Sequence, residues 1–76
     1  AVLGIPRADV IGAPYLNRLS SRQMEILGWI AQGKSNADIA IIVGSSKRTV
    51  DYHVSEILRK LEVASKAQAA AIYSSQ

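Results

Sequence analysis

Polar and charged side chains recur at helical spacing between residues 47 and 61. Five of them lie three or four positions apart and so share one face of a helix: Arg48, Asp51, Tyr52, Ser55 and Arg59. Hydroxyl, carboxylate and guanidinium groups of this kind hydrogen-bond to base edges and phosphates in a DNA groove. The opposite face is apolar and carries Val50, Val54, Ile57, Leu58 and Leu61. A helix with one apolar face that is buried and one polar face that is exposed is the kind of element that a protein presents to the major groove.

The polar face divides into candidates for base contacts and candidates for phosphate contacts. Placement in the groove would bring Asp51, Tyr52 and Ser55 toward base edges, where a carboxylate can accept from a cytosine N4 amine. Asp51 has a second interpretation, because a carboxylate in the first turns of a helix also interacts favourably with the helix dipole. Phosphate contacts are predicted for Lys34, Ser35, Asn36, Lys47, Arg48, Thr49, Arg59 and Lys60. A solvated surface without DNA contacts is the alternative for these residues.

Four serines predict where the helices that position this face begin. They precede the helical patterns and are Ser20, Ser35, Ser46 and Ser65. Ser20 is followed three residues later by Gln23, which is the spacing of a capping box. The predicted helices cover about 21–32, 36–43 and 47–61, with a fourth of about ten residues ending near Tyr73. Because no strand pattern competes, the predicted fold class is all-α, a four-helix bundle.

The second and third predicted helices have the spacing of a helix-turn-helix unit. Ala40 is small enough for the two backbones to approach closely, and Gly44 can take the positive φ that the turn needs. Val50 is then the first buried residue of the third helix. Ser45 departs from the pattern, since an aliphatic residue usually follows the turn glycine. The sequence therefore predicts a helix-turn-helix with one unusual turn position.

The chain is short and basic, with 76 residues, a formal charge of +3 and a pI near 9.6. This length allows one domain, and the charge permits a nucleic-acid partner without requiring one. Cysteine is absent, and no apolar run is long enough to span a membrane, so a cytoplasmic location is expected. Residues 1–18 contain Pro6 and Pro14 and are predicted to be an interdomain linker or a tail, which leaves 19–76 as the domain.

Catalysis is not expected from these residues. His53 lies between Asp51 and Ser55, but residues two apart on a helix point about 200° apart around its axis, so the three side chains cannot converge. One histidine without cysteine does not make a zinc site, and no cofactor-binding loop is present. We therefore expect neither an enzyme nor a bound metal or cofactor.

The segment from Leu19 to Ala71 resembles the LuxR-type, also called NarL/FixJ-type, DNA-binding domain of bacterial transcription regulators. The matching motifs are LSSRQMEIL, GKSNADIA, KRTVDYHV and LRKLEV, in this order and without gaps. The quorum-sensing branch of the family is the more similar one, because of Trp29, Gly33-Lys34 and the Tyr52-His53 pair. The sequence departs from the family at Gln23, Asp51 and Lys66, where Glu, a basic or amide residue, and Arg are usual.

The resemblance implies a partner, an assembly and a mode of control. The partner is double-stranded DNA, with the third helix in the major groove and the chain acting as a homodimer through its fourth helix. The implied interface residues are Ala64, Ala67, Gln68 and Ala71. Packing against the third helix is the rival role for the small residues among them. Control would come from an N-terminal domain outside this sequence, either one that binds an acyl-homoserine lactone or a phosphorylated receiver domain.

A second hypothesis belongs to a different functional class. In it, the chain is a helical protein-interaction module that binds RNA polymerase or a regulatory partner. The mixture of charges between Lys34 and Lys66, six basic and four acidic, and the carboxylate of Asp51 are compatible with that reading. DNA affinity that falls steeply with salt and depends on sequence favours DNA binding, whereas salt-independent partner binding favours the alternative.

Overall fold

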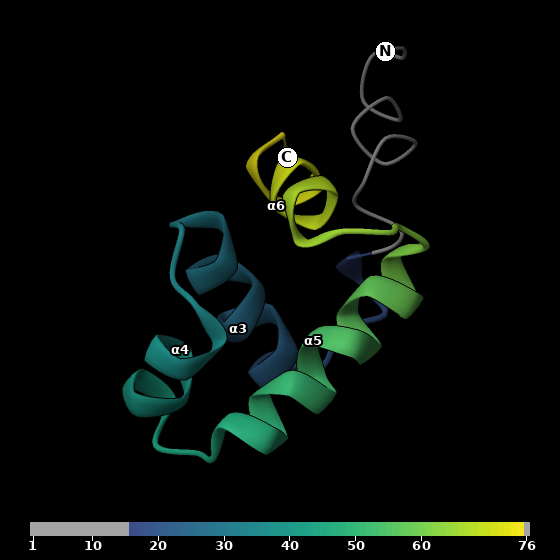
Figure 1. Cartoon of the computed structure of the whole chain (residues 1–76). Coiled ribbons are helices and arrows are strands. Elements are labelled where there is room, and N and C mark those ends of the chain that lie inside the picture. The colour runs from purple at the N-terminus through teal and green to yellow at the C-terminus, as the bar shows by residue number, and fades with distance from the viewer. Residues whose placement is uncertain (1–15, 76) are drawn as a thin grey trace, which may run out of the picture.

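The computed structural model describes residues 16–75, and helices are the only regular elements in that range. Their order is α3 (Ser21–Ala31), α4 (Asn36–Val43), α5 (Lys47–Leu61) and α6 (Lys66–Ser74). Figure 1 shows α4 and α5 joined by a short connection at one end, with α6 at the other. The predicted all-α class is confirmed. No helix within residues 16–75 combines the length and apolarity needed to cross a bilayer.

Each helix begins after one of the predicted serines. Ser20, Ser35, Ser46 and Ser65 are the N-caps, and each hydroxyl accepts from the backbone N–H three residues later. At Ser20 the capping box is complete, because Gln23 Oε1 accepts from the Ser20 backbone N–H at 3.2 Å. Such caps satisfy backbone donors that the helix itself leaves unpaired. The helix starts are therefore set by local sequence.

The turn between α4 and α5 has the predicted helix-turn-helix conformation. Gly44 ends α4 with φ of 71°, a conformation that is strained for residues with a Cβ. The Ser45 backbone N–H donates to Ala40 O at 2.9 Å, so the turn closes on a backbone hydrogen bond at the position where the aliphatic residue is missing. Ser46 then caps α5. The turn thus keeps its geometry despite the unusual serine.

One apolar core joins all four helices. Its buried members are Leu16, Ile26, Leu27, Ile30, Ile39, Ala40, Val50, Val54, Ile57, Leu61 and Ala69. Ile26 of α3 and Ala69 of α6 were not predicted to be buried, and both are fully buried; Leu16, which is also buried, belongs to the segment predicted as a linker or tail. The rest of that segment, residues 1–15, lies outside the described residues. The core holds the inner face of α5 against α3 and α4.

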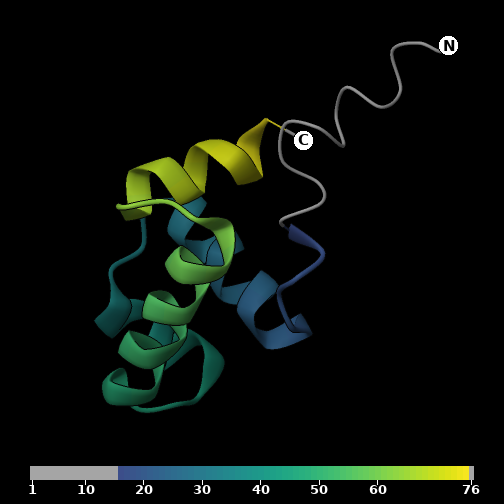
Figure 2. The ribbon, with the colours of Figure 1, turned by 90° about the vertical axis from the view of Figure 1, so that its right-hand side faces the viewer.

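Helix α6 lies across α3 and α5, as the side view in Figure 2 shows. Ala69 is its buried residue, and Ala70, Ile72 and Tyr73 pack against the core from partly buried positions. Gly28 of α3 faces Tyr73, and a Cβ at that position would lie 3.2 Å from Tyr73 Oη, a tight contact that a small shift of the Tyr73 side chain would relieve. Part of α6 is therefore a core element, and only its outer residues are left for a partner.

Candidate nucleic-acid interface

Helix α5 has the two faces that its sequence predicts. Val50, Val54, Ile57 and Leu61 are buried, and Leu58 packs against the core from a partly buried position. On the other side Arg48, Tyr52, Ser55 and Arg59 are exposed. The core therefore fixes the rotation of α5 about its axis, and this rotation decides which side chains face outward.

Three residues of the outer face lack side-chain hydrogen bonds within the described part of the chain. Arg48 and Ser55 are exposed, and Tyr52 keeps 61% of its surface exposed while its ring makes an edge contact with that of His53. An exposed phenol, hydroxyl and guanidinium without partners are available to a ligand that lies along α5. Tyr52 and Ser55 are predicted base contacts, and Arg48 is a predicted phosphate contact.

Asp51, the third predicted base contact, is engaged with neighbouring side chains. Its Oδ1 accepts from Asn36 Nδ2 at 2.8 Å, and its Oδ2 accepts from Lys47 Nζ at 3.0 Å. The hydrogen bond from Asn36 and then that from Lys47 lower the pKa of the Asp51 carboxyl. Asn36 in turn accepts from Lys66 Nζ at 3.2 Å through its Oδ1. Asp51 thus belongs to a chain of polar groups that connects α5 with α4 and α6.

Two further predicted phosphate contacts stand at the end of α5 and also have partners. Arg59 donates to both carboxylate oxygens of Glu56, with Nη2 at 2.6 Å from Oε1, and this pairing lowers the pKa of Glu56 and raises that of Arg59. Lys60 Nζ donates to Gln23 Oε1 at 2.9 Å. The Arg59 side chain is 67% exposed, so its pair with the partly buried Glu56 is weak and open to exchange with a phosphate, whereas Lys60 is anchored on a buried residue.

Gln23 is the buried polar residue beneath this end of α5, and it is 5% exposed. Its Oε1 accepts from Ser20 N and Lys60 Nζ, and its Nε2 lies 3.4 Å from His53 Nδ1. In this pair the Gln23 amide nitrogen can only donate, so His53 Nδ1 is the acceptor of any hydrogen bond between them. Asp51 and Ser55 are not among the partners of His53 on the described residues, so the three side chains do not converge.

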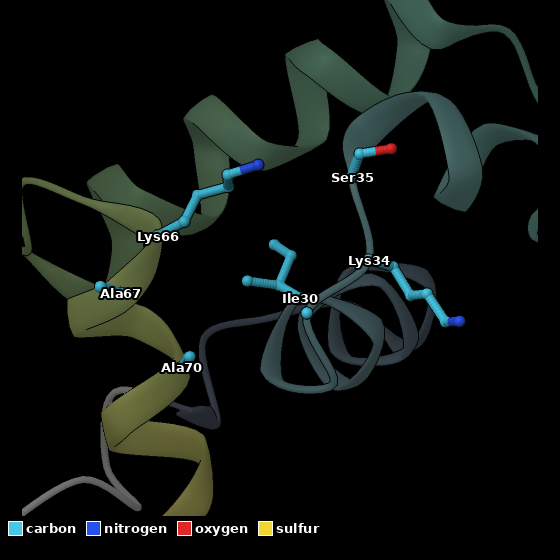
Figure 3. A pocket seen from close by; sticks show the side chains of 7 residues that line it. Ile30, Lys34, Ser35, Lys66, Ala67 and Ala70 are labelled. Atoms are coloured by element: carbon cyan, nitrogen blue, oxygen red, sulfur yellow. The ribbon is translucent and has the colours of Figure 1, made fainter.

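The remaining predicted phosphate contacts flank the starts of α4 and α5. Ser35 and Asn36 open α4, and Lys47 and Thr49 lie in the first turn of α5, where the Thr49 hydroxyl accepts from Ser46 Oγ at 3.0 Å. Lys34 and Ser35 also line a surface pocket of about 240 Å³ between the end of α3 and α6. Figure 3 shows the Lys66 side chain extending toward the start of α4, while Lys34 points away from it. Lys34 is therefore directed outward, as a phosphate contact requires.

The residues implied for a dimer interface lie on the outside of α6 and at its start. Ala64, Ala67 and Ala71 are exposed, and Ala67 lines the surface pocket. Gln68 is exposed too, but its Oε1 accepts from the Ala64 backbone N–H at 2.7 Å. The small side chains thus form an open surface, while Gln68 contributes to capping its own helix.

Comparison with known proteins places these features in a family. Residues 17–73 match the family model described as bacterial regulatory proteins, luxR family. The quorum sensing-dependent regulator RpaR of Rhodopseudomonas palustris is 46% identical over 55 residues, which cover 72% of this chain and 23% of RpaR. The activator AnoR of Acinetobacter nosocomialis is 44% identical over 62 residues, 82% of this chain and 26% of AnoR.

A third relative agrees with these two. The quorum-sensing regulator RhlR of Pseudomonas aeruginosa is 47% identical over 53 residues, covering 70% of this chain and 22% of RhlR. The chain therefore spans about a quarter of the length of these curated relatives. No solved structure matches the chain.

Proposed function

We propose that α5 enters the major groove with Tyr52 and Ser55 facing the bases, because the chain belongs to the luxR family of bacterial regulatory proteins and is a helix-turn-helix DNA-binding domain of the kind that transcription regulators carry. The observation that carries the proposal is the orientation of α5, whose inner residues are buried in the core while Tyr52 and Ser55 are exposed without hydrogen-bond partners on the described residues. Such a helix can enter the groove without losing its packing.

Phosphate contacts on both sides of the groove fix the position of α5. Arg48 and Lys34 are the first candidates, because both are exposed and neither side chain has an ion-pair partner within residues 16–75. Ser35, Asn36, Lys47 and Thr49 add polar groups at the helix starts, and Arg59 and Lys60 add charge at the end of α5. Arg59 exchanges its present partner for phosphate, whereas Lys47 and Lys60 keep theirs and share the phosphate contact with them. This arrangement gives binding that weakens as salt rises.

The bound form is a homodimer, with α6 of each copy meeting at a two-fold axis. The exposed alanines Ala64, Ala67 and Ala71 support this, because small side chains let two helices approach closely. Two recognition helices related by the axis read half-sites about one helical turn apart.

Within a whole regulator in the cytoplasm, an N-terminal domain that binds a signal such as an acyl-homoserine lactone controls the dimer. The quorum-sensing relatives RpaR and RhlR support that signal class over a receiver domain.

Selection of binding sites from random duplex DNA at near-physiological salt tests the function. We expect the chain to enrich an inverted repeat, with affinity that falls steeply as salt rises. A control selection uses the double variant Tyr52→Ala/Ser55→Ala, which keeps the net charge and is expected to enrich nothing specific. If the unmodified chain and the control give the same unselective, salt-sensitive binding, the assignment of α5 as the reading helix is wrong. Salt-insensitive binding to a polymerase subunit would favour a protein-interaction module.

A further inference from the structure

Asp51 is turned toward its own fold, although it stands on the outer side of α5. Its carboxylate lies between the first residue of α4 and the first residue of α5, accepting from Asn36 Nδ2 at 2.8 Å and from Lys47 Nζ at 3.0 and 3.3 Å. Asp51 is partly buried, whereas Tyr52 nearby is exposed and has no hydrogen-bond partner on the described residues. The two predicted base contacts therefore have different surroundings.

The Asn36 amide connects Asp51 to a third helix. Its Oδ1 accepts from Lys66 Nζ at 3.2 Å, while its Nδ2 donates to Asp51. An ammonium only donates and a carboxylate only accepts, so these two neighbours allow one orientation of the amide. The result is a chain of polar groups, Lys66 to Asn36 to Asp51 to Lys47, that runs from α6 through α4 to α5. It fixes the start of α4 relative to α5.

A base edge competes poorly for this carboxylate. The cytosine N4 amine is a neutral donor, as Asn36 Nδ2 is, so it offers no stronger hydrogen bond than the one Asp51 already has, and it lacks the positive charge by which Lys47 also attracts the carboxylate. Turning Asp51 toward the groove would also leave Asn36 Nδ2 without its acceptor and bring a negative charge closer to phosphates. Asp51 therefore keeps its present partners more easily than it gains a base.

We propose that Asp51 is a positioning residue for DNA binding, which holds Asn36 and Lys47 in place for phosphate contacts and leaves base reading to Tyr52 and Ser55. This inference rests on the proposed function, since it concerns how the same surface binds DNA. The lysines at both ends of the chain of polar groups, Lys66 and Lys47, offset the negative charge of Asp51 where DNA approaches. Asp51 is thus compatible with a DNA-binding surface without reading a base.

Two substitutions at position 51 separate positioning from base reading. Asp51→Asn removes the charge but retains an oxygen that accepts from Asn36 and Lys47, whereas Asp51→Ala removes the acceptor as well. We expect both variants to select the same consensus site as the unmodified chain. Asp51→Ala should bind that site about threefold to tenfold more weakly than Asp51→Asn, the range that one hydrogen bond gives. In an Asn36→Ala background this difference should shrink, because only the contact with Lys47 is left to distinguish the two variants.

Base reading predicts a different selection. Asn prefers adenine, so Asp51→Asn would change one base pair in each half-site of the consensus, and Asp51→Ala would lose the preference there. Either change overturns the proposal. Asp38→Ala serves as the control for removing a carboxylate, because Asp38 is exposed in α4 and has no ion pair within the described residues. If the unmodified chain enriches no site at all, the proposed function fails rather than this inference alone.

A measurement without DNA tests the polar contacts directly. In nitrogen-15 spectra the side-chain amide protons of Asn36 should be shifted from the usual Asn position and should return toward it in Asp51→Ala. In Asp51→Asn they should stay close to their original position. Asn36 signals that do not respond to Asp51→Ala would overturn the positioning role, whatever the DNA experiment gives.

Discussion

The Lys60 ammonium donates a 2.9 Å hydrogen bond to Oε1 of Gln23, across 37 positions in the sequence. The same oxygen completes the capping box at the start of α3 by accepting from Ser20 N. One amide therefore ties the last turn of α5 to the first turn of α3. Because α5 carries the proposed reading face, the stability of this contact bears on the presentation of that face to DNA.

Removing the Gln23 side chain should destabilise the fold. Gln23→Ala loses the capping partner of Ser20 and the acceptor of Lys60 at a buried position, and we expect a loss of about 1–3 kcal/mol in the free energy of unfolding. Urea unfolding followed by circular dichroism at pH 7 measures it. Gln23→Glu keeps both acceptor contacts and should stay near the original stability. Equal losses in the two variants would show that the amide nitrogen of Gln23, and not its oxygen, contributes to the stability of the fold.

The outer face of α5 should separate specific from general affinity. Tyr52→Ala and Ser55→Ala are expected to weaken binding to the selected site by about 1–3 kcal/mol per lost base contact and to leave binding to random DNA nearly unchanged. Arg48→Ala should weaken binding to both DNAs alike and lower the salt slope by about one. Fluorescence anisotropy over a series of salt concentrations measures all three. Equal losses on both DNAs for every variant would contradict the assignment of reading residues.

The proposed dimer interface can be tested without changing the charge of the protein. Ala71 is exposed on α6, so Ala71→Gln should leave the stability of the monomer intact while holding two copies apart. We expect binding to the inverted repeat to fall about tenfold, with little change for a single half-site. Ser21→Gln adds the same side chain at an exposed position of α3 and is the matched control. Unchanged affinity of Ala71→Gln for the inverted repeat would place the interface elsewhere.

The end of α5 carries backbone strain that substitution should relieve. Glu62 caps the helix with φ of 59°, a left-handed conformation that glycine adopts without strain. Its side chain also pairs with Arg18 at 3.1 Å in an exposed ion pair. Glu62→Gln removes the pair and keeps the strain, so we expect Glu62→Gly to be more stable than Glu62→Gln by about 1 kcal/mol. Thermal unfolding of the two variants measures the difference, and a Gly variant no more stable than the Gln variant would contradict it.

Acid should weaken the fold partly through Asp51 and Glu56. Hydrogen bonds from Asn36 and Lys47 lower the pKa of Asp51, and the bond from Arg59 lowers that of Glu56. A carboxyl whose pKa is lower in the folded state adds stability above its unfolded pKa of about 4 and loses it as the pH falls through the folded value. Urea unfolding between about pH 5 and pH 2 should therefore show a shallower loss of stability for Asp51→Asn than for the unmodified chain. An identical slope in both proteins would contradict a lowered pKa at Asp51.

Local features of the fold were predictable because short sequence patterns specify them. The four N-cap serines, the turn at Gly44 and the buried stripe from Val50 to Leu61 all depend on residues a few positions apart. Ile26 was not predicted to be buried because α3 packs against more than one neighbouring helix. A pattern with a single apolar stripe predicts only one buried side of α3 and therefore omits Ile26. Leu16 lies in the segment predicted as a linker or tail, and its burial follows from tertiary packing against the core.

The contacts within the candidate site were less predictable. Asp51 was correctly placed on α5, but its partner Asn36 lies on another helix, and the approach of the two depends on the packing of α4 against α5. The same holds for Lys60, whose partner Gln23 was identified only as a capping residue. The charged and hydrogen-bonding side chains can be identified from the sequence, whereas the pairs that they form across helices depend on tertiary packing. The identities of the site residues were therefore easier to predict than their interactions.

The separation of α5 into a packed face and an exposed face bears on how such regulators diverge after gene duplication. Tyr52 and Ser55 make no contribution to the buried core, so mutations there can redirect a copy to new promoters without first impairing its folding. Asp51 is the exception, because it contacts Asn36 of α4 and, through Asn36, is connected to Lys66 of α6. A lineage that changes Asp51 must also accommodate Asn36 and Lys66, so these three positions are expected to vary together among descendants.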